Sequence, residues 1–199
     1  MQYILAERAK TLKASEIREL LKVTEQPEII SFAGGLPDPA LFPIEELAKM
    51  SQTVFATDAH AALQYGPTEG YGLLRDIIAY ERMAKAKVIS HRDEILITAG
   101  SQQGIEFCAR LFLNDGDYII CEDPSYLGAI NVFDTYHANY LTVPMDEDGM
   151  IIEELEKILQ SNHKPKFIYT IPDFQNPTGI TMSIERRKRL VKLATQYKI

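Results

Sequence analysis

The stretch EILITAGSQQGIEFCARLFLNDGDYIICE, residues 94–122, decides the fold class. It begins with a short apolar run at 94–99 and ends with a second one at 118–122, and apolar residues recur at helical spacing over 101–113. Such runs predict buried strands, and the segment between them predicts a helix. One face of that helix should carry three apolar side chains: Ile105, Cys108 and Phe112.

The same alternation continues toward residue 199. We predict helices at 126–136, 150–159 and 183–197 and strands at 140–143 and 166–171. The last helix should turn three side chains inward: Leu190, Val191 and Ala194. Repeated strand–helix units favour an α/β fold in which a mainly parallel sheet is buried between layers of helices.

The residues before this region are less regular. Helical spacing predicts helices at 15–23, 44–57 and 72–87. Glycines and prolines interrupt the two segments between them, at 29–43 and 63–72, and therefore predict loops there.

Composition excludes several classes of function. The 199 residues contain 21 Lys plus Arg against 28 Asp plus Glu, a net charge of −7, so binding of nucleic acid through its phosphates is not expected. No apolar run is long enough for a membrane span, and no secretory signal begins the chain, so we expect a cytoplasmic protein. Cys108 and Cys121 are predicted to be buried, reduced thiols. The scattered histidines predict no metal site: His60, His91, His137 and His163.

Three loops follow, or lie at, the carboxyl ends of predicted strands, where open α/β sheets bind ligands. Gly100 permits a tight turn before Ser101 opens a helix whose free N–H groups favour a phosphate. Tyr126 opens the next helix and offers an aromatic face, and Asn176 in QNPTG offers an amide. Each feature alone is also common as a helix cap, a packing residue or a turn. Together they fit a flat, phosphorylated aromatic ligand.

Four segments carry a resemblance to a known family: SFAGGLPDPALFP (31–43), LQYGPTEGYGLLR (63–75), 95–126 and FIYTIPDFQNPTGITMSIERRKRL (167–190). They resemble the class I/II aminotransferases, pyridoxal-5′-phosphate (PLP) enzymes of fold type I, and most closely their 2-aminoadipate/aromatic branch. The resemblance implies an incomplete α-β-α sandwich. Residues 1–43 would form an N-terminal arm or small-domain segment, and 44–199 the first part of the large PLP-binding domain.

The resemblance also implies roles for individual residues in holding PLP. Gly100, Ser101 and Gln102 would hold its phosphate at the helix start. Tyr126 would stack on the pyridine ring, and Asn176 would hydrogen-bond the ring hydroxyl oxygen and lie near the substrate carboxylate.

Three further residues would act on the substrate or across a homodimer. Tyr65 would reach the phosphate in the partner subunit's site. Gly35 would lie against the substrate, and Arg18 would meet its distal group. The Schiff-base lysine and the aspartate that pairs with the pyridinium nitrogen would lie after Ile199, so no catalytic residue is assigned and the 199-residue chain is expected to be inactive alone.

The expected reaction of the complete protein is transfer of an amino group from an amino acid to a 2-oxo acid. Three alternatives remain open from the sequence. One is another fold-type-I PLP enzyme, such as a C–S lyase or a decarboxylase-like member. The others are a non-enzymatic domain that senses PLP or an amino acid, as in related transcriptional regulators, and a self-contained flavodoxin-like domain that binds FMN.

Overall fold

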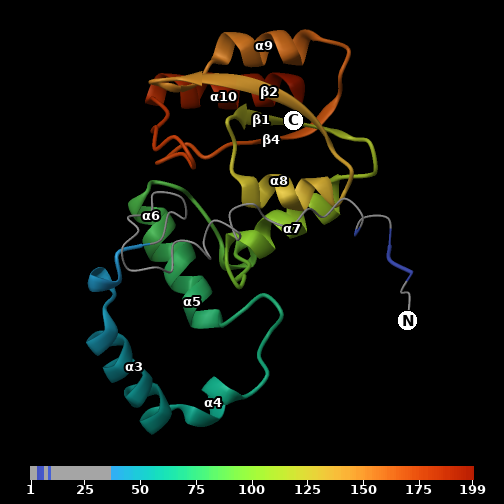
Figure 1. Cartoon of the computed structure of the whole chain (residues 1–199). Coiled ribbons are helices and arrows are strands. Elements are labelled where there is room, and N and C mark those ends of the chain that lie inside the picture. The colour runs from blue at the N-terminus through green and yellow to red at the C-terminus, as the bar shows by residue number, and fades with distance from the viewer. Residues whose placement is uncertain (1–3, 7–8, 10–36) are drawn as a thin grey trace, which may run out of the picture. The chain divides into compact units, whose positions relative to one another are not determined.

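The computed structural model describes residues 4–6, 9 and 37–199 (Figure 1). The predicted helix at 15–23, Arg18 and Gly35 lie outside the described residues. The chain divides into two compact units, and most of the described residues of one lie in 37–98 and of the other in Ala99–Ile199.

Residues 37–98 form a helical unit. Its main helices are α3 (Ile44–Thr57), α4 (Ala59–Leu63), α5 (Gly72–Asp76) and α6 (Met83–Lys85), with a π-helical stretch, Ile77–Arg82, that makes α5 and α6 continuous. The predicted helices at 44–57 and 72–87 are therefore confirmed. The buried Arg75 donates hydrogen bonds to the carbonyl oxygens of Ile95 (2.9 Å) and Arg92 (2.9 Å), which fixes the segment after α6 against this helix.

A four-stranded sheet forms the centre of the Ala99–Ile199 unit. The strands are β1 (Tyr118–Asp123), β2 (Asn139–Asp146), β3 (Gly149–Met150) and β4 (Pro165–Tyr169), in the order β3-β2-β1-β4. β1 pairs in parallel with both β2 and β4, as the alternating sequence predicted. β3 pairs antiparallel with β2 across a tight turn in which Gly149 has φ +96°, a hairpin that the sequence reading missed.

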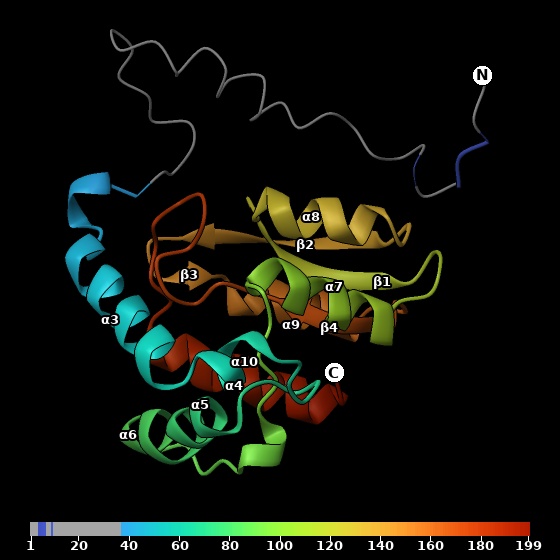
Figure 2. The same ribbon diagram turned by 90° about the horizontal axis from the view of Figure 1, so that it is seen from below.

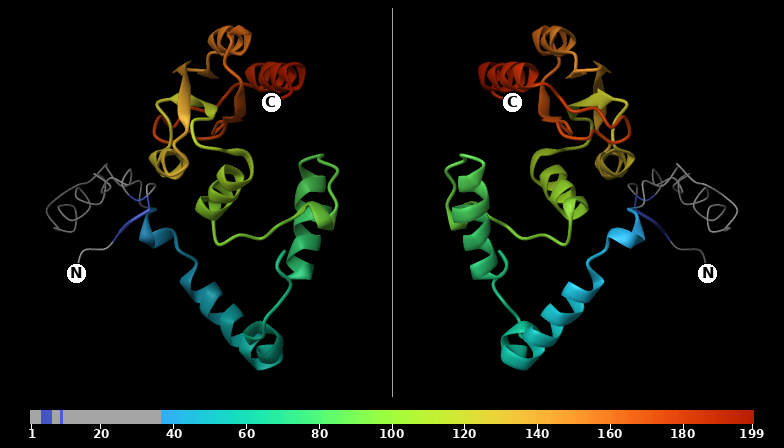
Figure 3. Two further views of the ribbon diagram at one scale, coloured as in Figure 1. Left: turned by 90° about the vertical axis from the view of Figure 1, so that its right-hand side faces the viewer. Right: turned by 90° about the vertical axis from the view of Figure 1, so that its left-hand side faces the viewer.

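Helices cover both faces of this sheet (Figures 2 and 3). The four helices are α7 (Ser101–Phe112), α8 (Leu127–Asp134), α9 (Ile152–Gln160) and α10 (Ile184–Tyr197). Because neighbouring side chains of a strand point to opposite faces, Ile119 packs with α7 and α8 while Ile120 packs with α9 and α10. The unit is an α-β-α sandwich, which confirms the predicted layers.

The predicted strand at 94–99 is wrong. Residues 92–94 form a 3₁₀ turn, and 95–98 belong to no sheet. A strand needs a neighbour for its ladder of hydrogen bonds, and in the part of the chain that the structure describes the Ile97 N–H donates only to the carbonyl oxygen of Glu69 (2.9 Å). An apolar run signals burial and extension but does not supply the partner.

Two predicted helix faces are rotated from the observed ones. In α7 the side chains toward the sheet are centred on Ala109, which is buried, whereas Cys108 and Phe112 are exposed. In α10 Leu193 is buried and Val191 is exposed. In a short helix the same spacing of apolar residues is compatible with more than one buried face. Spacing alone therefore did not show which face meets the sheet. The burial predicted for Cys121 is confirmed.

The β2–β3 hairpin is held to α10 by one ion pair. The two guanidinium nitrogens of Arg186 bind the two carboxylate oxygens of Asp146 at 2.5 and 2.6 Å, and Arg186 also donates to the carbonyl oxygen of Gly149 (2.8 Å). Bidentate pairs of this kind are stronger than single contacts. The Arg186 guanidinium holds the pKa of Asp146 below its usual value.

We predict that Asp146→Asn lowers the free energy of unfolding at pH 7 by about 1 kcal/mol. Because the folded-state pKa of Asp146 is depressed, its stabilisation is complete above the unfolded value of about 3.9 and is lost as pH falls through the folded value. Urea unfolding of both proteins at pH 7 and at pH 3 measures this. A stability difference that is as large at pH 3 as at pH 7 would contradict the assignment.

Candidate functional site

In the described part of the chain, the start of α7 presents unpaired backbone N–H groups. Gly100 precedes it with φ 129° and ψ 171°, a backbone conformation open essentially only to glycine. No side chain caps the helix and its first turn contains no acidic residue. Among the described residues, the backbone N–H groups of Ser101 and Gln102 have no hydrogen-bond acceptor. Two free donors at the positive end of a twelve-residue helix favour a phosphate or carboxylate.

The loop after β1 lies directly beside this helix start. The Gln102 side chain donates from Nε2 to the carbonyl oxygen of Gly128, at 3.0 Å, in the first turn of α8. A Cβ atom at Gly128 would lie 2.4–2.5 Å from the ring of Tyr126, so the half-buried ring rests against the glycine. The structure therefore brings Gln102 and Tyr126, two of the predicted site residues, to one place.

The loop that follows β4 meets the loop that follows β1. The buried Gln175 donates from Nε2 to the carbonyl oxygen of Pro124, at 2.9 Å, two residues before Tyr126. Asn176, the next residue, is exposed at the tip of this loop. β1 and β4 are parallel, so both loops leave the sheet at its carboxyl edge. The three predicted loops thus share one edge of the sandwich, as the sequence indicated.

Glu122 is a buried member of this edge that the sequence reading missed. It is the last residue but one of β1, and only 1% of its surface is exposed. Its carboxylate accepts hydrogen bonds from the Thr170 hydroxyl (2.5 Å), the Ile171 N–H (3.3 Å) and Gln175 Nε2 (3.1 Å). The available signal was a charged residue that closes the apolar run YIIC, because buried carboxylates are retained where donors meet them.

Arg187 of α10 holds together the two ends of the loop between β4 and α10 that carries Asn176, called here the Asn176 loop. Its guanidinium donates to the carbonyl oxygens of Pro172 and Met182, both at 2.8 Å, on the two sides of the loop. It also pairs with the Asp173 carboxylate at 2.7 Å, and this contact lowers the pKa of Asp173. The loop is therefore anchored at its base as well as through Gln175.

The half-buried Tyr169 and the buried Cys121, both near the edge, stay neutral at physiological pH. Burial raises the pKa of the Tyr169 hydroxyl to about 12, and the nearby Tyr126 and Glu122 add to this shift. Burial, with the charges of Asp123 and Glu122, raises the pKa of the Cys121 thiol to about 11. A thiol with so high a pKa is a poor nucleophile, so Cys121 is a packing residue.

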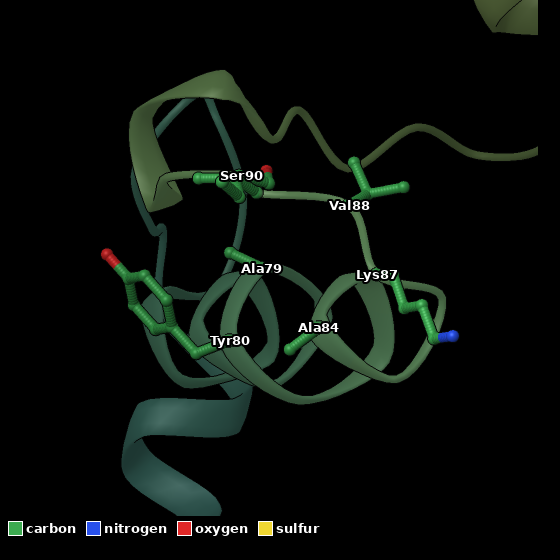
Figure 4. A pocket seen from close by; sticks show the side chains of 7 residues that line it. Ala79, Tyr80, Ala84, Lys87, Val88 and Ser90 are labelled. Carbon is green, nitrogen blue, oxygen red and sulfur yellow. The ribbon is translucent and has the colours of Figure 1, made fainter.

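Tyr65 is fully exposed in the 37–98 unit, and its role stays a prediction, as do those of Gly35 and Arg18. That unit also contains an open pocket of about 350 Å³ beside α6 (Figure 4). The Tyr80 hydroxyl and the Lys87 ammonium point away from each other there, and none of the predicted site residues lines the pocket.

Two kinds of feature are absent from the described ranges. Within residues 37–199, every helix is too short or too polar to reach across a bilayer. The same part of the chain brings together no trio of histidine, cysteine, aspartate or glutamate side chains suited to a metal ion.

The model of the family "Aminotransferase class I and II" matches residues 27–199. This chain belongs to the class I and II aminotransferases. It is 43% identical over 196 residues to aromatic-amino-acid aminotransferase 1 of Thermococcus litoralis, a match that covers 96% of this chain and 47% of that protein.

Solved aminotransferases have the same fold. The kynurenine aminotransferase of Pyrococcus horikoshii is 40% identical, with a TM-score of 0.90 over 98% of this chain and 49% of its own. The α-aminoadipate aminotransferase of Thermus thermophilus, solved with N-(5′-phosphopyridoxyl)-L-leucine, is 40% identical, with a TM-score of 0.85 over 98% of this chain and 47% of its own. The predicted family and fold type are confirmed, and the chain spans about half the length of the relatives it matches.

Proposed function

We propose that the whole protein to which these residues belong is a PLP-dependent aminotransferase that moves an amino group from an amino acid to a 2-oxo acid. The observation that carries the proposal is the uncapped start of α7 beside the Tyr126 and Asn176 loops at one sheet edge. Membership of the aminotransferase family supports it. Relatives named for aromatic amino acids, kynurenine and α-aminoadipate suggest an aromatic or a long acidic substrate.

The residues at this edge fit PLP. Free N–H groups at Ser101 and Gln102 suit a phosphate, and Gly100 leaves open space where a Cβ atom would project. Tyr126 would lie on the pyridine ring, and the exposed amide of Asn176 would donate to the ring hydroxyl oxygen. When bound, PLP supplies an electron sink for negative charge at the substrate Cα. The described residues of this edge bind and orient the cofactor, and none of them is assigned a proton-transfer step.

The proposal extends to the organisation of the protein. Residues 1–43 would form an N-terminal arm or small-domain segment, and 44–199 the first part of the large PLP-binding domain. Tyr65 would act across a homodimer, Gly35 and Arg18 would contact the substrate, and the protein would be cytoplasmic. Family membership supports the homodimer and the PLP-binding domain by resemblance.

We predict that Asn176→Ala in the whole protein raises the dissociation constant of PLP by about 10- to 100-fold, because it removes a donor to a charged oxygen. Absorbance titration of the apoprotein with PLP measures this. Asn131→Ala is the matched control, because Asn131 is exposed on α8 and its side chain has no hydrogen-bond partner among the described residues, so the change should leave PLP affinity unaltered. Equal PLP affinity in all three proteins would contradict the role of Asn176.

The reaction type is tested with the cofactor spectrum. Mixing the PLP-loaded whole protein with aromatic or acidic amino acids should convert the cofactor to its pyridoxamine form, because only a transaminase leaves the amino group on the cofactor. A C–S lyase would regenerate PLP, and a sensing domain would leave the cofactor unconverted. Either outcome would refute the aminotransferase proposal.

A further inference from the structure

The Gln175 side chain makes every hydrogen bond that a primary amide can make, although it is 1% exposed. Its Nε2 donates to Glu122 Oε2 at 3.1 Å and to the Pro124 carbonyl oxygen at 2.9 Å. Its Oε1 accepts from the Thr178 N–H at 2.9 Å and from the Thr178 hydroxyl at 2.7 Å. Two donors and two acceptors are thereby satisfied, which fixes the orientation of the amide.

These four bonds join two loops that are far apart in the sequence. Glu122 and Pro124 belong to the end of β1 and the turn that leads to Tyr126. Thr178 belongs to the loop that carries Asn176. The Asn176 loop is also closed on itself, because the Gln175 N–H donates to the Ile180 carbonyl oxygen at 2.8 Å. The Gln175 amide is thus a direct bridge between the two turns.

The buried carboxylate of Glu122 requires a hydrogen-bond donor at position 175. The Thr170 hydroxyl and the Ile171 N–H already donate to its carboxylate. A buried carboxylate requires donors on all sides, and an acceptor at position 175 would place two oxygens in contact. The amide of Gln175 meets the carboxylate with its nitrogen and Thr178 with its oxygen, whereas an ionised glutamate of the same shape has no donor for Glu122.

We propose that Gln175 is a positioning residue that sets the spacing between Tyr126 and Asn176, and therefore the width of the gap that receives the pyridine ring of PLP. This inference rests on the proposed function. Gln175 contacts neither the start of α7 nor its free N–H groups, so it acts on the ring end of the site and not on the phosphate end. Supporting partners of a binding residue commonly set its affinity by holding it in place.

The test uses Gln175→Glu in the whole protein, a change that keeps the shape and replaces the donating nitrogen with an oxygen. We expect the dissociation constant of PLP, from absorbance titration, to rise by roughly tenfold. Inorganic phosphate, measured as a competitor of PLP, should keep its inhibition constant because the α7 start is untouched. A purely structural defect would weaken the binding of both probes.

The reciprocal double variant Glu122→Gln with Gln175→Glu restores a donor facing an acceptor between the two side chains, but it leaves a glutamate oxygen against the Pro124 carbonyl oxygen. It should therefore recover only part of the lost affinity, with a dissociation constant of PLP clearly below that of Gln175→Glu alone. Thr178→Val removes the exposed hydroxyl that donates to Gln175 Oε1 and accepts from the Ile180 N–H at 3.3 Å, so it should fold and raise the dissociation constant by a few-fold. If Gln175→Glu fails to fold, Thr178→Val tests whether the Gln175 bridge sets the affinity for PLP.

Unchanged PLP affinity in folded Gln175→Glu, or in Thr178→Val if the first variant does not fold, would overturn the inference. Equal weakening of PLP and inorganic phosphate would also overturn it. If the unchanged whole protein does not bind PLP at all, the proposed function fails instead, so the two failures are distinguishable.

Discussion

Replacing Ser101 with aspartate is expected to raise the dissociation constant of PLP in the whole protein by ~100-fold. The carboxylate would occupy the start of α7, where the free N–H groups of Ser101 and Gln102 would otherwise meet the cofactor phosphate. Two like charges a few ångströms apart near a protein surface repel by about 1–4 kcal/mol, and each 1.4 kcal/mol is tenfold in affinity. Absorbance titration with PLP measures the loss.

This variant separates binding from folding. An acidic residue in the first turn of a helix stabilises it by about 0.3–1 kcal/mol, so the free energy of unfolding of the apoprotein should not fall. Ser101→Asn is the matched control, because asparagine has nearly the same size as aspartate but no charge. The asparagine variant should therefore lose far less affinity for PLP than the aspartate variant. The loss in the aspartate variant should also shrink as salt screens the repulsion. Equal losses in both variants would contradict an anion site at α7.

Phe133→Ala is expected to have the largest effect on stability, about 3–5 kcal/mol in the free energy of unfolding. Phe133 is 1% exposed in the cluster between the sheet and helices α7 and α8. Its ring centroid lies 5.5 Å from that of Phe167 and 5.6 Å from that of Tyr169. Truncation leaves a cavity that the neighbouring rings fill only in part. Urea or guanidinium unfolding measures the change.

Phe112 provides the control for this prediction. It contacts the same Phe167 ring, with centroids 6.5 Å apart, but it is 55% exposed. Phe112→Ala should therefore cost less than about 1 kcal/mol. A similar loss in the two variants would show that burial on this face of the sheet does not decide the stability of the sandwich.

The layers of the sandwich could be predicted from the sequence, because the apolar patterns that mark its helices and strands are local. Ile44–Thr57 formed the expected helix to the residue, and the apolar run at 118–122 became β1. The site edge was also predictable, because the carboxyl ends of parallel strands gather at one edge whatever the side chains are. Tyr126 and Asn176 needed only their positions after β1 and β4 to be placed there. Ser101 follows a segment that forms no strand, and the Gln102–Gly128 hydrogen bond is what brings the start of α7 to the loop after β1.

The sequence could not show which segments and side chains pair with one another. Residues 94–99 are apolar but form no ladder, and the β2–β3 hairpin depends on the turn at Gly149. The link between Glu122 and Gln175 spans 53 residues, so no local pattern contains it. Only the pairing of β1 and β4 brings the two side chains together.

The measurement that tests the central claim most directly is a crystal structure of the whole protein with PLP bound. The account predicts that the phosphate accepts hydrogen bonds from the N–H groups of Ser101 and Gln102, with the ring on Tyr126 and its hydroxyl oxygen at Asn176. Cofactor density at any other edge of the sheet, or a phosphate that does not contact the start of α7, would contradict it.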